Sequence, residues 1–393
     1  MISLSSIVLG LLKDACASDV HLTVGEPLWY RLHGDMHRYK NPEGEEFTLT
    51  ENMINLFMED IRKDVPAHDA LAGNASSDRS GDDFAATING FRVRGNLALA
   101  NGKKLSLVLR GISPVIPKPE EIRIPQNLID MGERSHGLIL VTGPTGSGKS
   151  TTLASLLDHI NHNQVKHIET IEDPVEYHFE SAKCKITRKE IGKEAGNFYA
   201  ALRSAMRQDP DIILVGEIRD YETMRAALMA AETGHLVYAT LHTSSAAKTI
   251  ERVMSFFPDN EKDWARDVVA SVLIATISQV LLPKAGGNGR VMAYELMVNT
   301  SSIASQIRDN KAHTLNNSLD QGVSDGQISK DMCLIQMLTS NLITTEVALA
   351  HGSSAFKEKL GVHQGKAAST HQQSAPAKTA APAQAGGGAR SAL

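Results

Sequence analysis

A glycine-rich octapeptide, GPTGSGKS, occupies residues 143–150 of this chain. It lies between an apolar run at residues 138–142 and a helix-like stretch from Ser150 onward. In this strand–loop–helix context the glycines let backbone N–H groups surround phosphates, Lys149 reaches the β- and γ-phosphate oxygens, and the Ser150 hydroxyl faces a Mg²⁺ ion. The motif therefore predicts a nucleoside triphosphate site with ATP and Mg²⁺ as ligands, in preference to a merely structural glycine-rich turn. The predicted nucleotide-binding residues are Gly143, Pro144, Thr145, Gly146, Ser147, Gly148, Lys149, Ser150 and Thr151.

A carboxylate that can orient water follows a later apolar run. In DIILVGEIRD, residues 211–220, the run ends in Gly216 and Glu217, which brings Glu217 to the carboxyl end of the predicted sheet. Hydrolysis of a phosphoanhydride needs such a water-positioning group. Glu217 is therefore the predicted catalytic base, and the alternative is a solvated glutamate that caps a helix.

An acidic segment, TIEDPVE, covers residues 170–176 and ends another predicted strand. Paired acids suit Mg²⁺ held through water, because this ion keeps several waters and takes few direct protein ligands. We predict Ser150 as a metal-binding residue and Glu172 as one that acts through water. A surface acidic turn with Pro174 at its corner is the alternative.

Two histidines bracket the run at residues 236–240, in the segment GHLVYATLHT. His235 and His242 fall at opposite ends of one strand and cannot both contact the same atom. Both are predicted functional residues, one of them as a sensor of the γ-phosphate, although a lone histidine usually has a structural role.

Length and charge limit the function classes. The chain has 393 residues, enough for two domains, and a formal net charge of −5, which gives no electrostatic reason to expect nucleic acid as a partner.

Its three cysteines, Cys16, Cys184 and Cys333, are far apart, so a disulfide framework and a four-thiolate zinc site are both excluded. The first twelve residues lack the basic start and cleavage site of a signal peptide and are interpreted as an amphipathic helix. The apolar stretch at residues 268–282 is too short and too polar to span a bilayer.

The pattern of short runs divides the chain. Strands are predicted at residues 20–24, 29–32, 91–97 and 105–109 with a helix at 51–62, which together form an α+β module at 1–113. A proline-rich linker at 114–128 follows. Alternating strands (138–142, 167–171, 212–215, 236–240) and helices (150–162, 197–207, 221–233) predict a parallel sheet covered on both faces within 129–300. Helices at 302–308, 330–341 and 345–350 predict a helical subdomain at 301–358, and residues 359–393 have the composition of a disordered tail.

Four boxes in fixed order, GPTGSGKSTT, TIEDPVEY, DPDIILVGEIRD and AAETGHLVYATLHTSSAAKTIERV, resemble the secretion ATPase superfamily, and most closely its type IV pilus retraction branch. The resemblance extends from Ala17 to about Leu342. It implies an α/β chain with a PAS-like α+β N-terminal domain, a RecA-like P-loop ATPase domain and nucleotide bound between them. It further implies a homohexamer in the cytoplasm, at the inner face of the bacterial inner membrane. Hydrolysis would drive domain rotation, transmitted to a pilus platform protein there.

By the same resemblance, Lys149 and Ser150 match the phosphate-loop residues, Glu172 the acidic-box carboxylate and Glu217 the catalytic glutamate. His235 and His242 match the histidine pair. The family also supplies arginines from its N-terminal domain, and Arg92 and Arg110 match two of them. A further arginine of that pattern is replaced by Gly90. Either Arg94, two residues beyond Arg92 on the same strand face, replaces it or the site has one cation fewer.

A second departure lies at residues 302–309, SIASQIRD, where retraction ATPases carry a motif similar to AIRNLIRE. The internal arginine is missing, which weakens retraction as the specific task. The chain also lacks the four-cysteine zinc insertion of the assembly and type II secretion branch. The leading hypothesis is thus a hexameric retraction motor. The alternatives are a regulatory nucleotide-binding subunit bound to a paralogous pilus ATPase, a pilus-assembly or type II secretion ATPase and, least favoured, a nucleic-acid translocase.

Overall fold

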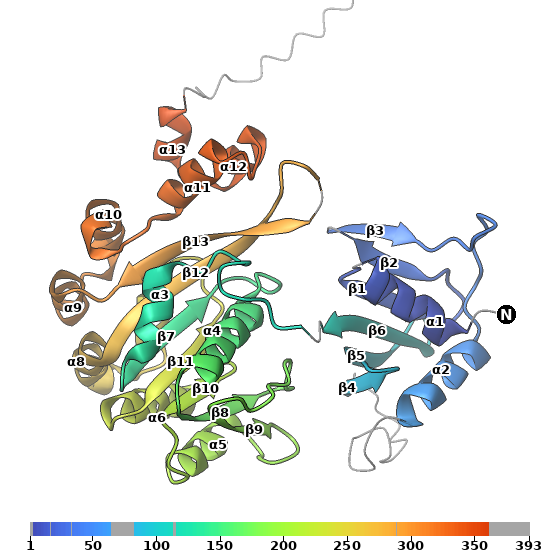
Figure 1. The fold of residues 1–393 in the computed structure, drawn as a ribbon, viewed down its shortest axis with the longest axis horizontal. Coiled ribbons are helices and arrows are strands. Elements are labelled where there is room, and N and C mark those ends of the chain that lie inside the picture. Colours follow the sequence, from blue (N-terminus) through green and yellow to red (C-terminus); the bar gives the residue numbers. More distant parts are fainter. Residues whose placement is uncertain are drawn as a thin grey trace, which may run out of the picture. The chain divides into compact units, whose positions relative to one another are not determined.

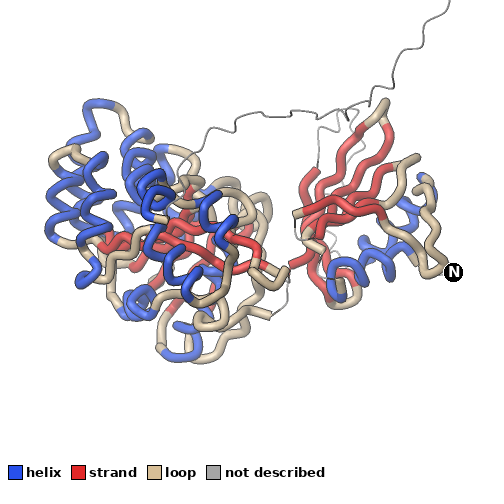
Figure 2. Tube along the Cα trace, turned by 90° about the horizontal axis from the view of Figure 1, so that it is seen from above, coloured by secondary structure: helices blue, strands red, loops and turns tan. Residues whose placement is uncertain are grey.

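The computed structural model describes residues 3–15, 17–32, 34–63, 82–112, 115–287 and 289–360. Two compact units divide between Gly352 and Ser353. Within the described ranges no helix combines the length and apolar character needed to cross a membrane. The predicted disordered tail, from residue 361 onward, lies outside the described residues. Figures 1 and 2 show two sheets, each with helices packed against it.

The N-terminal domain is built on a six-stranded antiparallel sheet with the order β3-β2-β1-β6-β5-β4. The strands are β1 (Asp19–Thr23), β2 (Trp29–Leu32), β3 (Asp35–Arg38), β4 (Asp82–Ile88), β5 (Phe91–Ala100) and β6 (Lys104–Ile112). Helices α1 (Leu4–Leu9), which continues as a π-helical turn to Asp14, and α2 (Glu51–Lys63) contribute to its apolar core. The predicted helix and four strands are confirmed. β3 and β4 were not predicted; in β3 all four side chains are exposed, so no apolar alternation marks that strand.

The second sheet has seven strands in the order β13-β12-β7-β11-β10-β8-β9. They are β7 (Gly137–Thr142), β8 (His167–Glu172), β9 (Lys185–Glu190), β10 (Ile212–Val215), β11 (Leu236–Leu241), β12 (Leu273–Pro283) and β13 (Arg290–Val298). All neighbours are parallel except β12 and β13. Every residue of β7 is buried, as expected for a central parallel strand. The four predicted strands are confirmed, whereas the apolar stretch at 268–282 is divided between the end of a helix and β12.

Helices cover both faces of this sheet. They are α3 (Gln126–Asp130), α4 (Lys149–Asn163), α5 (Phe198–Ala205), α6 (Tyr221–Glu232), α7 (Ala246–Ser255) and α8 (Lys262–Val272). Leu138 and Leu140 of β7 belong to one core with α5, α6, α7 and α8. α3 and α4 lie over the opposite face (Figure 1). Side-chain caps fix where the helices start: the Asp220 carboxylate accepts a hydrogen bond of 2.7 Å from the Thr223 N–H at the start of α6.

The C-terminal part is helical, as predicted. It contains α9 (Ser301–Arg308), α10 (Leu315–Gln321), α11 (Lys330–Thr339) and α12 (Thr345–His351). α13 (Ser354–Lys359) belongs to the second compact unit. The predicted fold class, a PAS-like α+β domain followed by a RecA-like core and a helical C-terminal part, is therefore confirmed. α3 begins inside the stretch interpreted as a linker, at Gln126.

Candidate functional site

The glycine-rich loop connects the end of β7 to the start of α4, at the carboxyl edge of the parallel strands. Gly148 is the N-cap of α4 and has a φ of 89°, a left-handed conformation that favours glycine. Gly143 has a φ of 146°, and a Cβ added there would lie 2.3 Å from the backbone oxygen of Gln279. The backbone thus requires glycine at both positions. The first N–H groups of α4, which have no intrahelical acceptor, face this loop and make its end attractive to anions.

Lys149 lies across the loop. Its Nζ donates hydrogen bonds to the backbone oxygens of Gly143, at 3.0 Å, and Pro144, at 3.2 Å. Burial lowers the pKa of this ammonium group, while the carboxylates of Glu217 and Glu176 act in the opposite direction. The cation is therefore within the electrostatic influence of the predicted catalytic base.

The Glu217 carboxylate, just after β10, is held from two sides. Arg219 donates from NH2 to Oε2 at 2.7 Å, and the His242 Nε2 lies 3.0 Å from Oε1. Partial burial raises the pKa of this carboxyl group, but Arg219, His242 and Lys149 together outweigh burial and lower it below the ordinary value. Glu217 is therefore ionised at neutral pH, oriented, and able to accept a proton.

The two histidines have different surroundings. His242 follows β11 and reaches Glu217 on the neighbouring strand, as expected for carboxyl ends of parallel strands. His235 precedes β11 at the opposite edge of the sheet, where its Nδ1 lies 3.0 Å from the backbone oxygen of Ala230. The structure therefore brings His242 to the loop edge and leaves His235 away from it.

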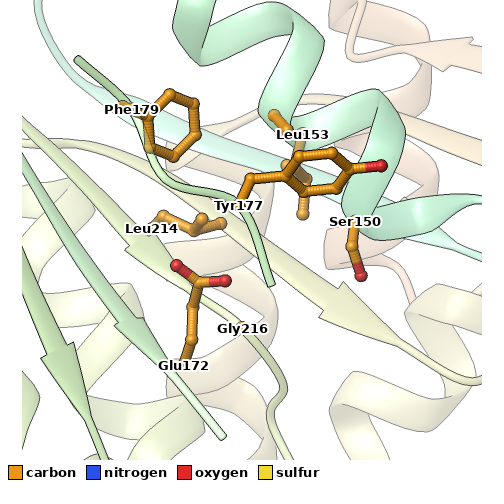
Figure 3. Close-up of a pocket in the computed structure, with 8 residues that line it drawn as sticks. Ser150, Leu153, Glu172, Tyr177, Phe179, Leu214 and Gly216 are labelled. Carbon is orange, nitrogen blue, oxygen red and sulfur yellow. The ribbon is translucent and has the colours of Figure 1, made fainter. Parts of the chain in front are cut away.

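Glu172 ends β8 and enters a small pocket (Figure 3). The pocket is lined by Ser150, Leu153, Ala154, Glu172, Tyr177, Phe179, Leu214 and Gly216. One carboxylate oxygen, Oε2, accepts a hydrogen bond of 3.2 Å from the Glu176 N–H, while Oε1 is buried without a hydrogen-bond partner among the described residues. Burial raises the pKa of Glu172 to about 7, despite the opposing effects of that backbone hydrogen bond and of the nearby Thr170 hydroxyl. This carboxyl group is thus near its titration midpoint at neutral pH, unlike Glu217.

Two further residues support the loop and were not predicted. Tyr177 lines the pocket (Figure 3), and its hydroxyl lies 3.0 Å from the Thr151 hydroxyl on α4. Gln279 of β12 donates from Nε2 to the Ser147 backbone oxygen at 2.8 Å. The sequence contains a signal for each: the tyrosine ends the acidic box, and the glutamine is a polar residue within the otherwise apolar stretch at 268–282.

The predicted arginines lie on one face of the N-terminal sheet. Phe91 and Val93 of β5 face the core, so the intervening Arg92 and Arg94 lie on the opposite face, as predicted. Arg94 pairs in register with Arg110 on β6. Arg110 binds the Asp19 carboxylate at 2.8 Å, and Arg92 donates from NH2 to the Val175 backbone oxygen at 3.2 Å.

The missing arginine at Gly90 has a local explanation. Asn89 and Gly90 form the two-residue turn between β4 and β5, with φ values of 47° and 78°, and Ile88 pairs directly with Phe91. A turn with both central residues at positive φ favours Asn-Gly and disfavours a long side chain at its second position. The geometry of this hairpin turn therefore explains why glycine occupies position 90.

The second departure, at residues 302–309, lies on α9. Ile303 and Ile307 are buried and pack into the main core, and Ala304, which replaces the arginine of the motif, is buried beside them. Gln306 accepts a hydrogen bond of 2.9 Å from the Thr314 hydroxyl and binds the segment before α10. The face of α9 that remains exposed carries small polar residues and one basic side chain, Arg308.

Several known proteins are similar to this chain in sequence and in structure. Residues 123–348 match the family described as Type II/IV secretion system protein. The chain is 42% identical over 335 residues to the Type IV pilus retractation ATPase PilT of Pseudomonas aeruginosa, with 84% of this chain and 93% of that protein covered. It is 40% identical over 320 residues to a twitching motility protein of Neisseria gonorrhoeae, with 81% and 82% covered. The crystal structure of the pilus retraction motor PilT with bound ADP aligns with a TM-score of 0.77 at 36% identity, covering 91% of this chain and 100% of that chain.

Proposed function

Because this chain belongs to the Type II/IV secretion system protein family, we propose that it is an ATPase that powers retraction of a type IV pilus, as in twitching motility. The observation that carries the proposal is the oriented, ionised carboxylate of Glu217 beside the cation of a glycine-rich loop. The relative solved with ADP supports nucleotide binding at the equivalent fold.

The residues at the loop edge have different roles in the proposed hydrolysis of ATP. The N–H groups of the loop and Lys149 bind the β- and γ-phosphates of ATP. Glu217 orients a water molecule for attack on the γ-phosphorus and takes up its proton. Arg219 and His242 hold one carboxylate oxygen each, so that the base keeps a single orientation.

We propose that the site also binds Mg²⁺. The Ser150 hydroxyl would bind the ion directly, and Glu172 would bind it through water. The fit rests on Ser150 and the buried, unpartnered Oε1 of Glu172 lining one pocket. When bound, Mg²⁺ would neutralise negative charge on the phosphate oxygens.

The N-terminal arginines are proposed to complete the site. Arg92 and Arg110 would stabilise charge on the transferred phosphoryl group, with Arg94 on the same sheet face replacing the arginine absent at Gly90. His235, at the opposite sheet edge, would then act on the position of β11 and not on the nucleotide.

The proposal includes an oligomeric state and protein partners. We expect a homohexamer that acts on a pilus platform protein at the cytoplasmic face of the inner membrane, with a paralogous pilus ATPase as a further partner and no role for nucleic acid. Buried Ala304, where retraction ATPases carry an arginine, favours one second candidate: an accessory subunit that binds nucleotide and contributes little turnover.

One experiment separates these candidates. ATP hydrolysis would be measured with Mg²⁺ for wild type and for Glu217→Gln, with the mass of each determined by light scattering. A motor should turn over ATP and lose about 10²–10⁴-fold in kcat in the variant, the range for general-base removal, at unchanged ADP affinity and mass. Negligible turnover by a wild type that still binds ADP would refute the motor and support the accessory subunit.

A further inference from the structure

Gln279, a buried glutamine on β12, makes hydrogen bonds to the glycine-rich loop and to the first turn of α4. Gln279 is only 3% exposed, and both ends of its amide are used. Its Nε2 donates to the Ser147 backbone oxygen at 2.8 Å, and its Oε1 accepts from the Thr152 hydroxyl at 3.0 Å. These two contacts lie on either side of residues 149–151, so one side chain spans the segment that contains Lys149 and Ser150.

The amide can have only one orientation. The Ser147 carbonyl is an acceptor and needs the amide nitrogen, whereas Thr152 donates its proton to the amide oxygen. Both partners are buried, with Ser147 2% exposed and Thr152 1% exposed. Water is therefore excluded from both hydrogen bonds. A side chain without the amide removes this partner from the Ser147 oxygen and leaves the Thr152 hydroxyl only the weak acceptor Met292 Sδ, at 3.8 Å.

The backbone of the same residue sets the start of the loop. The Gln279 carbonyl oxygen occupies the space that a Cβ of Gly143 would need, at 2.3 Å. Its side-chain nitrogen lies 3.3 Å from the position of a Cβ on Gly148. β12 pairs with β7 beside the loop and with β13 on its other side, where Gln279 lies opposite Tyr294. Gln279 thus contacts the loop near its start and near its end.

We infer that Gln279 is a positioning residue for nucleotide binding, which holds the loop so that Lys149 and the N-terminus of α4 keep the geometry that phosphates require. The inference rests on the proposed function, because it concerns the same site. It assigns to β12 a role in nucleotide affinity, beyond its role in the sheet.

Gln327 offers a matched control. It is 1% exposed, and its amide also makes two buried hydrogen bonds, here both to the backbone: it donates to the Val298 oxygen at 2.7 Å and accepts from the Val298 N–H at 2.8 Å. Val298 pairs with Ala275 at the other end of β12, away from the loop. Replacing either glutamine by leucine removes the same number of buried hydrogen bonds.

The experiment is calorimetric titration of the full chain with MgADP, with Tm measured in parallel. We expect Gln279→Leu to weaken ADP binding by about tenfold or more, since two buried groups at the loop lose their partners, while Gln327→Leu lowers Tm by a comparable amount and leaves affinity unchanged. Equal ADP affinity in wild type and both variants would overturn the inference.

A second substitution keeps the test decisive if Gln279→Leu is poorly folded. In Gln279→Glu, a protonated carboxyl can donate to the Ser147 oxygen and accept from Thr152, whereas a carboxylate repels that oxygen. Its ADP affinity relative to wild type should therefore recover as the pH is lowered, and a pH-independent ratio would contradict the inference. If wild type binds ADP without hydrolysing ATP, the motor proposal fails, whereas the assignment of Gln279 is still decided by the ADP affinities of the variants. If wild type does not bind ADP, both proposals fail.

Discussion

Replacing Glu172 by glutamine should stabilise the protein, and increasingly so as the pH rises. Burial raises the pKa of this carboxyl group from an ordinary value of 4.5 to about 7. The unfolded chain therefore releases the proton near the ordinary value, while the folded chain retains it until about neutral pH. Between these values the folded state binds more protons than the unfolded state, so each rise in pH favours unfolding. Glutamine resembles the protonated carboxyl group and does not titrate.

The size of the effect follows from the pKa shift. One pKa unit corresponds to about 1.4 kcal/mol, so the carboxyl group costs roughly 3 kcal/mol of folding free energy above neutral pH and less than about 1 kcal/mol near pH 5. The substitution also changes a local hydrogen bond, but that contribution is the same at every pH. The diagnostic quantity is thus the pH dependence of the difference between variant and wild type.

Urea unfolding followed by circular dichroism, from about pH 5 to about pH 8, measures this difference. All samples need one subunit concentration, because association shifts apparent stability. Glu217→Gln is the control: its carboxyl pKa is lowered, so the carboxylate is ionised in both the folded and the unfolded chain above about pH 5, and removing the charge should cost a nearly constant amount of stability over this range. A difference between wild type and Glu172→Gln that stays constant over this range would refute the description of Glu172 as a desolvated carboxyl group.

Two other substitutions test the loop and the core. Gly143→Ala should abolish tight MgADP binding in a titration, because the new Cβ would lie 2.3 Å from a backbone oxygen of β12; Gly286→Ala, with no atom within 4 Å of the new Cβ, should bind as wild type. Lys189→Met should lower the unfolding free energy by about 3–5 kcal/mol, because it leaves the fully buried Glu169 carboxylate without its ion-pair partner. Lys185→Met, at an exposed position of the same strand, should change it by less than about 0.5 kcal/mol, and equal losses in the two variants would show that the buried pair is not stabilising.

The sequence predicted those parts of the site that directly follow a strand. The loop, Glu172, Glu217 and His242 come after β7, β8, β10 and β11, and carboxyl ends of parallel strands meet at one edge. The polar strand β9 was missed because it lies at the sheet edge and has no buried run. The turn at Asn89 and Gly90 could have been recognised, since Asn-Gly between two strands is a strong hairpin signal.

Other properties depend on tertiary contacts. Gln279 contacts the loop only because β12 inserts beside β7, and neither spacing nor periodicity specifies which strands become neighbours. The raised pKa of Glu172 arises from the side chains that exclude water around it, which come from α4, β10 and the segment after β8. Glu172 and Glu217 both follow a predicted strand, so the sequence alone could not show that they differ in protonation.

The strand order also has a consequence for synthesis of the chain. β7, which leads into the loop, is flanked in the sheet by β11 and β12, and both emerge from the ribosome long after it. During translation the loop residues are thus present before the strands that shape them, and β7 lacks both of its permanent neighbours. The nucleotide site can be completed only after β12 has been made and inserted, so nascent chains that end before Leu273 should not bind nucleotide tightly.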